Sequence, residues 1–126
     1  MKKDYQTKIL VVDDSAFMRQ FIIGYLREYG FVHIEEAGNG KIAVRMYETQ
    51  KPDVVLLDLI MPVEDGPDAL GQLVALGAKV IVVSAVGQEK VIQEMLKKGA
   101  KGYFIKPFFS AQEIGDKILE VISKSE

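Results

Sequence analysis

The chain has 126 residues, of which 48% are hydrophobic, so we expect one domain with a buried core and no room for a second catalytic or DNA-binding domain. Its net charge of -2 comes from interspersed charges of both signs, which makes direct binding to nucleic acid unexpected. The absence of cysteine excludes disulfides, thiolate metal sites and a cysteine nucleophile.

The first apolar run, Ile9–Val12, has the two-sided hydrophobicity of a strand buried in a parallel sheet. It is too short for a secretory signal or a membrane span, so we expect a cytoplasmic protein without membrane insertion. The run stops at the doubled acid Asp13-Asp14, and Ser15 is expected to cap the helix that follows.

Residues 16–29 have the periodicity of an amphipathic helix, and Gly30 is its expected stop. Two apolar rows run along it, namely Phe17, Phe21, Tyr25 and Tyr29, and one step away Met18, Ile22 and Leu26. Weak alternation over residues 32–36 predicts a second strand. A loop at residues 37–40 then leads into a second helix over about residues 41–50.

The stretch around Asp58 delivers one carboxylate to the end of a buried strand. Its apolar run, Val54–Leu57, is typical of a third strand covered on both faces. Asp58 ends the run, Pro62 cannot continue a strand, and Asp65-Gly66 is a turn pair. Taken alone, this stretch favours an aspartate that only hydrogen-bonds its own turn.

A short third helix is predicted to begin at Pro67 and to end near Gly77. It should be the least stable helix, because Gly71 inside it costs about 1 kcal/mol relative to alanine. Residues 79–84 then repeat the pattern of an apolar strand that ends in one polar side chain, here Ser84.

The last third of the chain predicts a fourth helix, a fifth strand and a final helix. The fourth helix should stop at Gly99 and bury one apolar face, which consists of Val91, Ile92, Met95 and Leu96. Residues 101–107 predict the fifth strand, which ends in Lys106. Ser110 and Glu113 have the spacing of a capping box and open a helix whose apolar positions are Ile114, Ile118 and Val121.

Five strands alternating with five helices predict a single α/β domain over residues 1–126. We expect a (βα)5 flavodoxin-like fold, a doubly wound parallel sheet with right-handed crossovers. In such sheets ligands bind beyond the carboxyl ends of the strands, where the strand order reverses. The second strand ends in Glu36-Ala37 and should contribute least. An edge position explains this and gives the strand order 2-1-3-4-5.

At the carboxyl ends of the strands, this order brings together Asp13, Asp14, Asp58, Ser84 and Lys106. Two carboxylates about 4 Å apart repel by roughly 4 kcal/mol at an effective dielectric near 20, so a cation is expected among them. Oxygen donors without His or Cys favour Mg²⁺. A carboxylate beside Mg²⁺ and a lysine is suited to accept a phosphoryl group. Each side chain also has a plainer explanation, as a helix cap or as a solvated lysine.

The chain resembles the receiver domains of two-component response regulators, most of all the single-domain chemotaxis regulators. The resemblance runs from about Lys8 to Ile122. It rests on five motifs in order: VVDDS, the lone Asp58, MPVEDG, Ser84-Ala85 and Lys106-Pro107.

The resemblance implies a role for each acidic residue. Asp58 would be the phosphoacceptor. Mg²⁺ would be held by Asp13, Asp58 and the backbone carbonyl of Ile60, with Asp14 acting directly or through water. Ile60 is apolar where many receiver domains carry a polar group.

The resemblance also implies a switch. Ser84 and Lys106 would contact the phosphoryl group, the Lys106-Pro107 peptide would be cis, and Tyr103 would swing inward when the Ser84 hydroxyl moves. A histidine kinase would donate the phosphoryl group, and a downstream protein would bind the face formed by the fourth helix, fifth strand and last helix. We expect a monomer that catalyses only its own phosphorylation and dephosphorylation.

Other interpretations stay open at this point. Residues 13–19, DDSAFMR, also resemble the receiver of chemotaxis methylesterases, so the chain could belong to a larger regulator. An aspartyl phosphatase of the haloacid dehalogenase type is disfavoured, because Ile60 stands where its second Asp would be. A flavodoxin is disfavoured because Asp13-Asp14 would repel a flavin phosphate. A degenerate scaffold is disfavoured because no acceptor, ligand or lysine position is missing.

Overall fold

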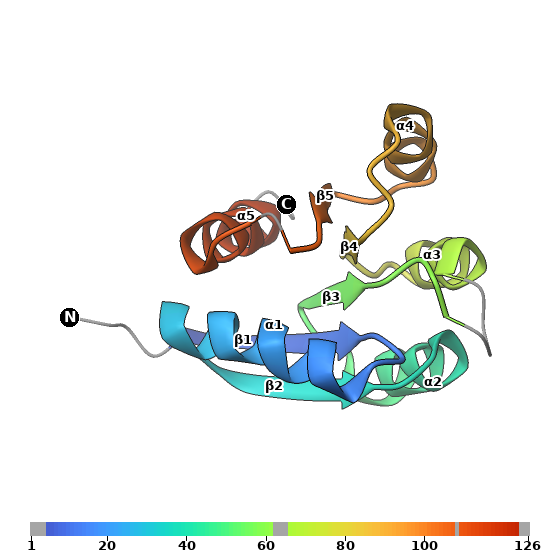
Figure 1. Cartoon of the computed structure of the whole chain (residues 1–126). Helices are drawn as coiled ribbons and strands as arrows, with labels where there is room; N and C mark the ends of the chain where they lie inside the picture. The colour runs from blue at the N-terminus through green and yellow to red at the C-terminus, as the bar shows by residue number, and fades with distance from the viewer. Residues whose placement is uncertain (1–4, 62–65, 108, 124–126) are drawn as a thin grey trace.

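The computed structural model describes residues 5–61, 66–107 and 109–123, and within them strands and helices alternate from end to end. The elements, in chain order, are β1 (Tyr5–Val12), α1 (Ala16–Tyr29), β2 (Phe31–Ala37), α2 (Gly40–Gln50), β3 (Val54–Leu57), α3 (Gly66–Ala75), β4 (Val80–Ser84), α4 (Glu89–Lys97), β5 (Gly102–Ile105) and α5 (Ala111–Ser123). The five strands form one parallel sheet in the order β2-β1-β3-β4-β5, which confirms the predicted topology (Figure 1). No helix in the described ranges is long and apolar enough to cross a membrane.

The apolar run of β1 shows how the sheet is covered on both faces. Successive side chains of a strand point to opposite faces. Leu10 and Val12 lie in the core with α2, α3 and α4, whereas Ile9 and Val11 lie in the core with α1 and α5. The sheet is therefore the middle of three layers, and helices cover both of its faces (Figure 1).

The helix ends follow the signals in the sequence. Ser15 caps α1, because its hydroxyl oxygen accepts a hydrogen bond from the Met18 N–H at 3.2 Å. Gly30 ends this helix with a φ of 122°, a conformation that favours glycine. Before α5, Ser110 and Glu113 form the predicted capping box. The Glu113 N–H donates to the Ser110 hydroxyl at 3.0 Å, and the Ser110 N–H donates to the Glu113 carboxylate at 2.8 Å.

The first two strands are longer than predicted. β1 begins at Tyr5, not at Ile9, and β2 begins at Phe31. Tyr5 pairs with Phe31 across the two strands, and its ring lies 5.6 Å from that of Tyr29 and 5.2 Å from that of Phe31. This aromatic packing extends both strands beyond the buried apolar run that predicted them.

The third helix begins one residue earlier than predicted, at Gly66, so Pro67 is its second residue. The Gly66 N–H donates to the Leu59 carbonyl at 3.1 Å, and a Cβ at Gly66 would lie 2.3 Å from the Leu59 Cα. Only glycine allows this close approach. Residues 62–65, which include Asp65 of the predicted turn pair and most of the MPVEDG motif, lie outside the described residues.

Two residues predicted on buried helix faces are exposed. Phe17, in the first turn of α1, is 77% exposed and belongs to neither core cluster. On α4 Leu96 is 37% exposed, and Met95 alone is buried while Val91 and Ile92 are half-buried. This helix lies at the periphery, over the last strands of the sheet, so one row of its side chains reaches the core (Figure 1).

Candidate functional site

Strand register brings the predicted carboxylates together. Val12 of β1 pairs with Leu57 of β3, and the Asp58 N–H donates to the Val12 carbonyl at 3.0 Å. Asp13 and Asp58, the residues that follow these two strands, therefore lie side by side. Asp13, Asp14 and Asp58 each offer a carboxylate oxygen, and these oxygens lie within 4.8 Å of one another. Asp13 and Asp58 are buried, whereas Asp14 is exposed.

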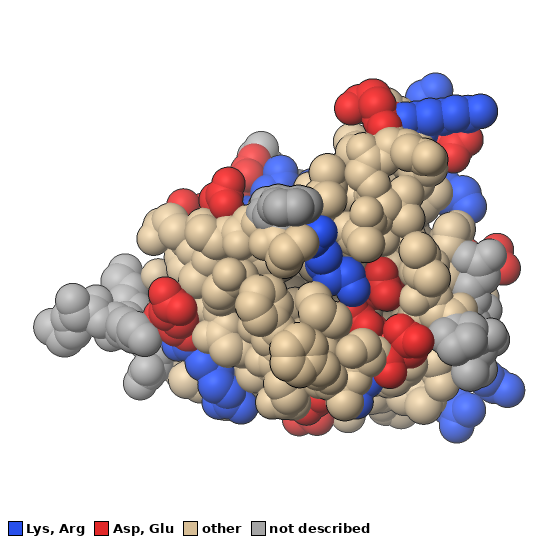
Figure 2. Space-filling view, viewed as in Figure 1, with Lys and Arg blue, Asp and Glu red and all other residues tan. Residues whose placement is uncertain are grey.

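Lys106, which directly follows the edge strand β5, reaches the same cluster. Its backbone N–H donates to the Ser84 carbonyl at 2.8 Å, which continues the pairing of β4 with β5 by one residue. Its Nζ lies 2.8 Å from Asp13 Oδ2 and 3.7 Å from Asp58 Oδ2. The Lys106-Pro107 peptide bond is cis, as the resemblance implied. Figure 2 shows acidic side chains in a hollow of the surface with a basic side chain beside them.

Burial makes the Asp58 carboxylate costly to ionise. Removal from water raises the pKa of Asp58, and the negative charge of Asp13 raises it further. The ammonium of Lys106 and the backbone N–H groups of Ile60 and Leu59 lower the same pKa and offset part of the effect. A second cation at the cluster would therefore favour the ionised form of Asp58.

Asp13 is held at all four of its polar groups. Its N–H donates to the Ala37 carbonyl at 3.1 Å, and its own carbonyl accepts a hydrogen bond from Arg19 Nη1 at 2.6 Å. Its Oδ1 accepts from the Ser15 N–H at 2.9 Å, and its Oδ2 accepts from Lys106 Nζ. The sequence interpretation gave Arg19 no role. The available signal was an arginine at the end of the first turn of α1, five residues after Asp14.

Ser84 and Tyr103 both contact the loop between β4 and α4. Ser84 is fully buried, and its hydroxyl oxygen accepts a hydrogen bond from the Val86 N–H at 3.2 Å. The half-buried Tyr103 donates from its hydroxyl to the Val86 carbonyl at 2.5 Å, and burial raises the pKa of that hydroxyl. The two predicted switch residues thus share one partner residue.

The donor set fits a hard divalent cation. Three carboxylates against the single ammonium of Lys106 leave excess negative charge, and carboxylate oxygens suit Mg²⁺ better than they suit zinc or copper. Ile60, whose carbonyl the resemblance names as a further ligand, follows Asp58 by two residues, and its side chain is 61% exposed.

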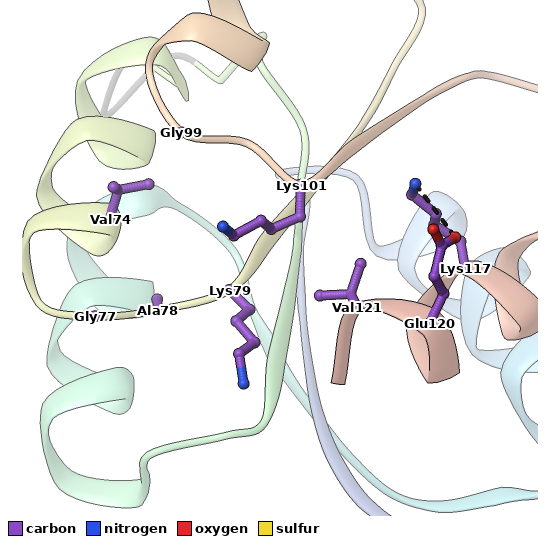
Figure 3. Close-up of a pocket in the computed structure, with 9 residues that line it drawn as sticks. All are labelled: Val74, Gly77, Ala78, Lys79, Gly99, Lys101, Lys117, Glu120 and Val121. Carbon is purple, nitrogen blue, oxygen red and sulfur yellow. Dashed lines mark ion pairs between the residues drawn. The ribbon is translucent and has the colours of Figure 1, made fainter. Parts of the chain in front are cut away.

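A cavity of about 560 Å³ lies near the amino ends of β4 and β5, and none of the candidate site residues lines it. It is lined by Val74, Gly77, Ala78, Lys79, Gly99, Lys101, Lys117, Glu120 and Val121 (Figure 3). In Figure 3 the side chains of Lys79 and Lys101 point in different directions, and Lys117 pairs with Glu120 at 3.5 Å. The lysines therefore do not converge on a common point in this cavity.

Comparison with known proteins identifies relatives across nearly the whole chain. Residues 9–119 match the response regulator receiver domain family. The chain is 42% identical over 120 residues to the chemotaxis protein CheY of Listeria monocytogenes, covering 94% of this chain and 97% of that protein. It is 39% identical over 120 residues to CheY of Bacillus subtilis, covering 94% of this chain and 96% of that protein.

Two solved structures are also similar. The CheX-CheY-BeF3-Mg²⁺ complex from Borrelia burgdorferi matches with a TM-score of 0.84 and 32% identity, over 91% of this chain and 88% of the matched chain. The response regulator domain of Thermotoga maritima CheB matches with a TM-score of 0.84 and 31% identity, over 93% of this chain and 96% of that one. Together with the family match, these similarities show that the chain belongs to the receiver domains of two-component response regulators.

Proposed function

We propose that this chain is a phosphorylation-dependent response regulator of a chemotaxis-type two-component system, with Asp58 as its phosphoacceptor. The observation that carries the proposal is the buried Asp58 carboxylate beside two further carboxylates and the Lys106 ammonium. The similarity to CheY proteins over most of the chain supports the chemotaxis assignment. A histidine kinase would be the phosphodonor, and such a switch would act in the cytoplasm.

Mg²⁺ is the proposed cofactor. Asp13, Asp14 and Asp58 would hold it together with the Ile60 carbonyl, and Asp14 would act directly or through water. When bound, Mg²⁺ would neutralise charge on the transferring phosphoryl group. The exposure of Asp14 supports an entry route from solvent, because the other two acids are buried.

The proposed reaction is transfer of a phosphoryl group from a donor histidine to Asp58. A carboxylate oxygen of Asp58 attacks phosphorus, so an O–P bond forms. The N–P bond of the donor breaks, and its electron pair stays on the imidazole nitrogen, which then takes a proton from solvent. Lys106 and the Ser84 hydroxyl would stabilise the phosphoryl oxygens, with the N–H of Ala85 as a further donor.

Hydrolysis of the acyl phosphate would return the switch to its first state. The protein would then be an enzyme only toward itself, because it catalyses its own phosphorylation and dephosphorylation. Ser84 would move its hydroxyl from the Val86 N–H to the phosphoryl group. Tyr103 shares Val86 as a partner, so the change would pass to α4 and β5. A downstream protein would bind the face formed by α4, β5 and α5.

A second candidate keeps the same chemistry in a larger regulator. The likeness to the receiver of Thermotoga maritima CheB favours this alternative, because the chain covers 96% of that domain at 31% identity. An aspartyl phosphatase is the weaker alternative, because Ile60 stands where the second acidic residue of such an enzyme is needed.

Incubation with acetyl phosphate tests the proposal. Intact-mass spectrometry should show one added phosphoryl group in the parent protein with Mg²⁺, little without Mg²⁺, and none in Asp58→Asn. A matched control is Asp53→Asn, which removes a carboxylate from the opposite end of β3. The control should be labelled like the parent, and labelling of Asp58→Asn at the parent's rate would contradict the assignment.

A further inference from the structure

A hydrogen-bonded chain links the end of β2 to the acidic cluster, although the sequence predicted that this strand contributes least. Arg19 Nε donates to Glu36 Oε1 at 2.8 Å, and Gln20 Nε2 donates to Glu36 Oε2 at 3.1 Å. The same guanidinium donates from Nη1 to the Asp13 carbonyl at 2.6 Å. Arg19 on α1 therefore joins the loop that carries Asp13 and Asp14 to the carboxyl end of β2.

The geometry requires an arginine. The guanidinium is planar, and its Nε and Nη1 atoms donate to two different acceptors at once, whereas a lysine ammonium would act from one point. The Arg19 side chain is only 19% exposed, and the position of a Cβ on Gly38 would lie 3.7 Å from Nη1, so the group is enclosed by the loop after β2. Arg19 is thus held on several sides.

Arg19 donates to the backbone carbonyl of Asp13, whereas Lys106 donates to Oδ2 of its carboxylate. A divalent cation that binds Asp13 competes with Lys106 for carboxylate oxygen. The contact of Arg19 with the backbone carbonyl involves no metal-binding atom, so it persists when the ammonium is displaced. This hydrogen bond then continues to fix the backbone that carries Asp13 and Asp14.

We propose that Arg19 is a positioning residue of this site, which fixes Asp13 and Asp14 for a divalent cation, and that Glu36 holds Arg19 and neutralises its charge. The inference rests on the proposed function for the identity of the cation, Mg²⁺. Outer contacts that orient metal ligands are commonly worth 10-fold or more in metal affinity.

Charge and positioning predict opposite signs for the loss of Arg19. A guanidinium next to the acids repels a divalent cation, so its removal should tighten Mg²⁺ binding if charge alone mattered. Positioning predicts weaker binding despite the loss of a positive charge. The direction of the change therefore separates the two explanations.

The test is Mg²⁺ titration of the unphosphorylated protein by calorimetry, with amide NMR of residues 13 and 14 as a second readout. Arg19→Met and Arg19→Lys should both weaken Mg²⁺ binding by roughly tenfold. Glu36→Gln keeps an acceptor for Arg19 Nε but leaves the guanidinium charge uncompensated, so it should weaken Mg²⁺ binding, and by less than the Arg19 variants do. Arg27→Met removes the same charge from the last turn of α1 and should stay close to the parent.

Melting without Mg²⁺ shows whether a variant is folded, and Arg19→Lys keeps the experiment usable if Arg19→Met is too unstable. In the Arg19 variants, half-maximal labelling by acetyl phosphate should require a higher Mg²⁺ concentration, but the labelling rate at saturating Mg²⁺ should be similar to that of the parent. Loss of the fold alone would not produce this pattern. Unchanged or tighter Mg²⁺ binding in Arg19→Lys would overturn the inference. If the parent itself bound no Mg²⁺, the proposed function would fail, and this inference with it.

Discussion

The Lys106 ammonium is hydrogen-bonded to Asp13 and not to Asp58: its Nζ lies 2.8 Å from Asp13 Oδ2 and 3.7 Å from Asp58 Oδ2. Asp13 is also a proposed ligand of Mg²⁺. A metal ion at this site would compete with the ammonium for the same carboxylate, and its binding would free Lys106 to meet the phosphoryl group on Asp58.

Lys106→Met tests this competition. Without Mg²⁺ the variant should lose up to about 3 kcal/mol of unfolding free energy, because two buried carboxylates are left without a counter-ion. With Mg²⁺ it should regain stability, and its melting temperature should rise more than that of the parent. The control is Lys101→Met, an exposed lysine at the opposite edge of the sheet. Equal Mg²⁺-induced shifts in Lys106→Met and the parent would rule out the competition.

Asp58→Asn should change how stability depends on pH. Burial raises the folded-state pKa of Asp58 above its unfolded value. The stabilisation from its protonated form is therefore complete below the unfolded pKa and is lost as pH rises through the folded pKa. Without Mg²⁺, the variant should melt at a higher temperature than the parent at pH 7, and the difference should shrink toward pH 4. A constant difference across this range would contradict a raised pKa.

Gly115→Ala should disrupt the contact between α1 and α5. A Cβ at residue 115 would lie 2.1 Å from Tyr29 Cδ1, and the Tyr29 ring is confined by Phe31, whose ring centroid is 5.3 Å away. We expect a loss of about 1 to 3 kcal/mol in unfolding free energy, measured by urea denaturation. Gly71→Ala is the matched control. Apart from its chain neighbours and the backbone of its own helix, no heavy atom of the described residues lies within 4 Å of the added Cβ, so this change should stabilise by about 0.5 to 1 kcal/mol. Equal effects at both positions would exclude the steric explanation.

Ile60→Asn should shorten the life of the phosphorylated state. The Ile60 side chain is 61% exposed on the loop after Asp58, where it can shield the acyl phosphate from water but cannot orient a water molecule. A change of about 1.4 kcal/mol in the barrier would alter the rate of dephosphorylation tenfold. The rate is measured after removal of the phosphodonor. Ile42→Asn, at an exposed isoleucine of α2, is the control. An unchanged or slower rate in Ile60→Asn would show that this side chain does not limit access of water.

The sequence predicted the convergence of Asp13, Asp58 and Lys106 because each directly follows a strand of the parallel sheet. Because the strands are parallel, the residues that follow them lie together at the carboxyl ends of the sheet. This placement depends little on the details of the side chains. Turn and cap signals such as Gly30 and the Ser110-Glu113 capping box are local, so they were also readable.

The contacts of Arg19 could not be predicted from local sequence in the same way. Arg19 and Glu36 are 17 residues apart, and their meeting depends on how far β2 extends beside β1. The exposure of Phe17 has a similar cause. Its spacing fits the apolar face of α1, but it lies in the first turn of the helix and outside both core clusters. Periodicity gives the face of a helix and does not show where along the helix the core ends.

The most direct test of the central claim is chemical mapping of the phosphorylated residue. Borohydride reduces an acyl phosphate to an alcohol, which converts the modified aspartate to homoserine. Protein labelled by acetyl phosphate with Mg²⁺ is reduced, digested and sequenced by mass spectrometry. The account predicts homoserine at position 58 and unmodified aspartate at positions 13 and 14. Homoserine at position 13 or 14, or labelling that leaves position 58 unmodified, would contradict it.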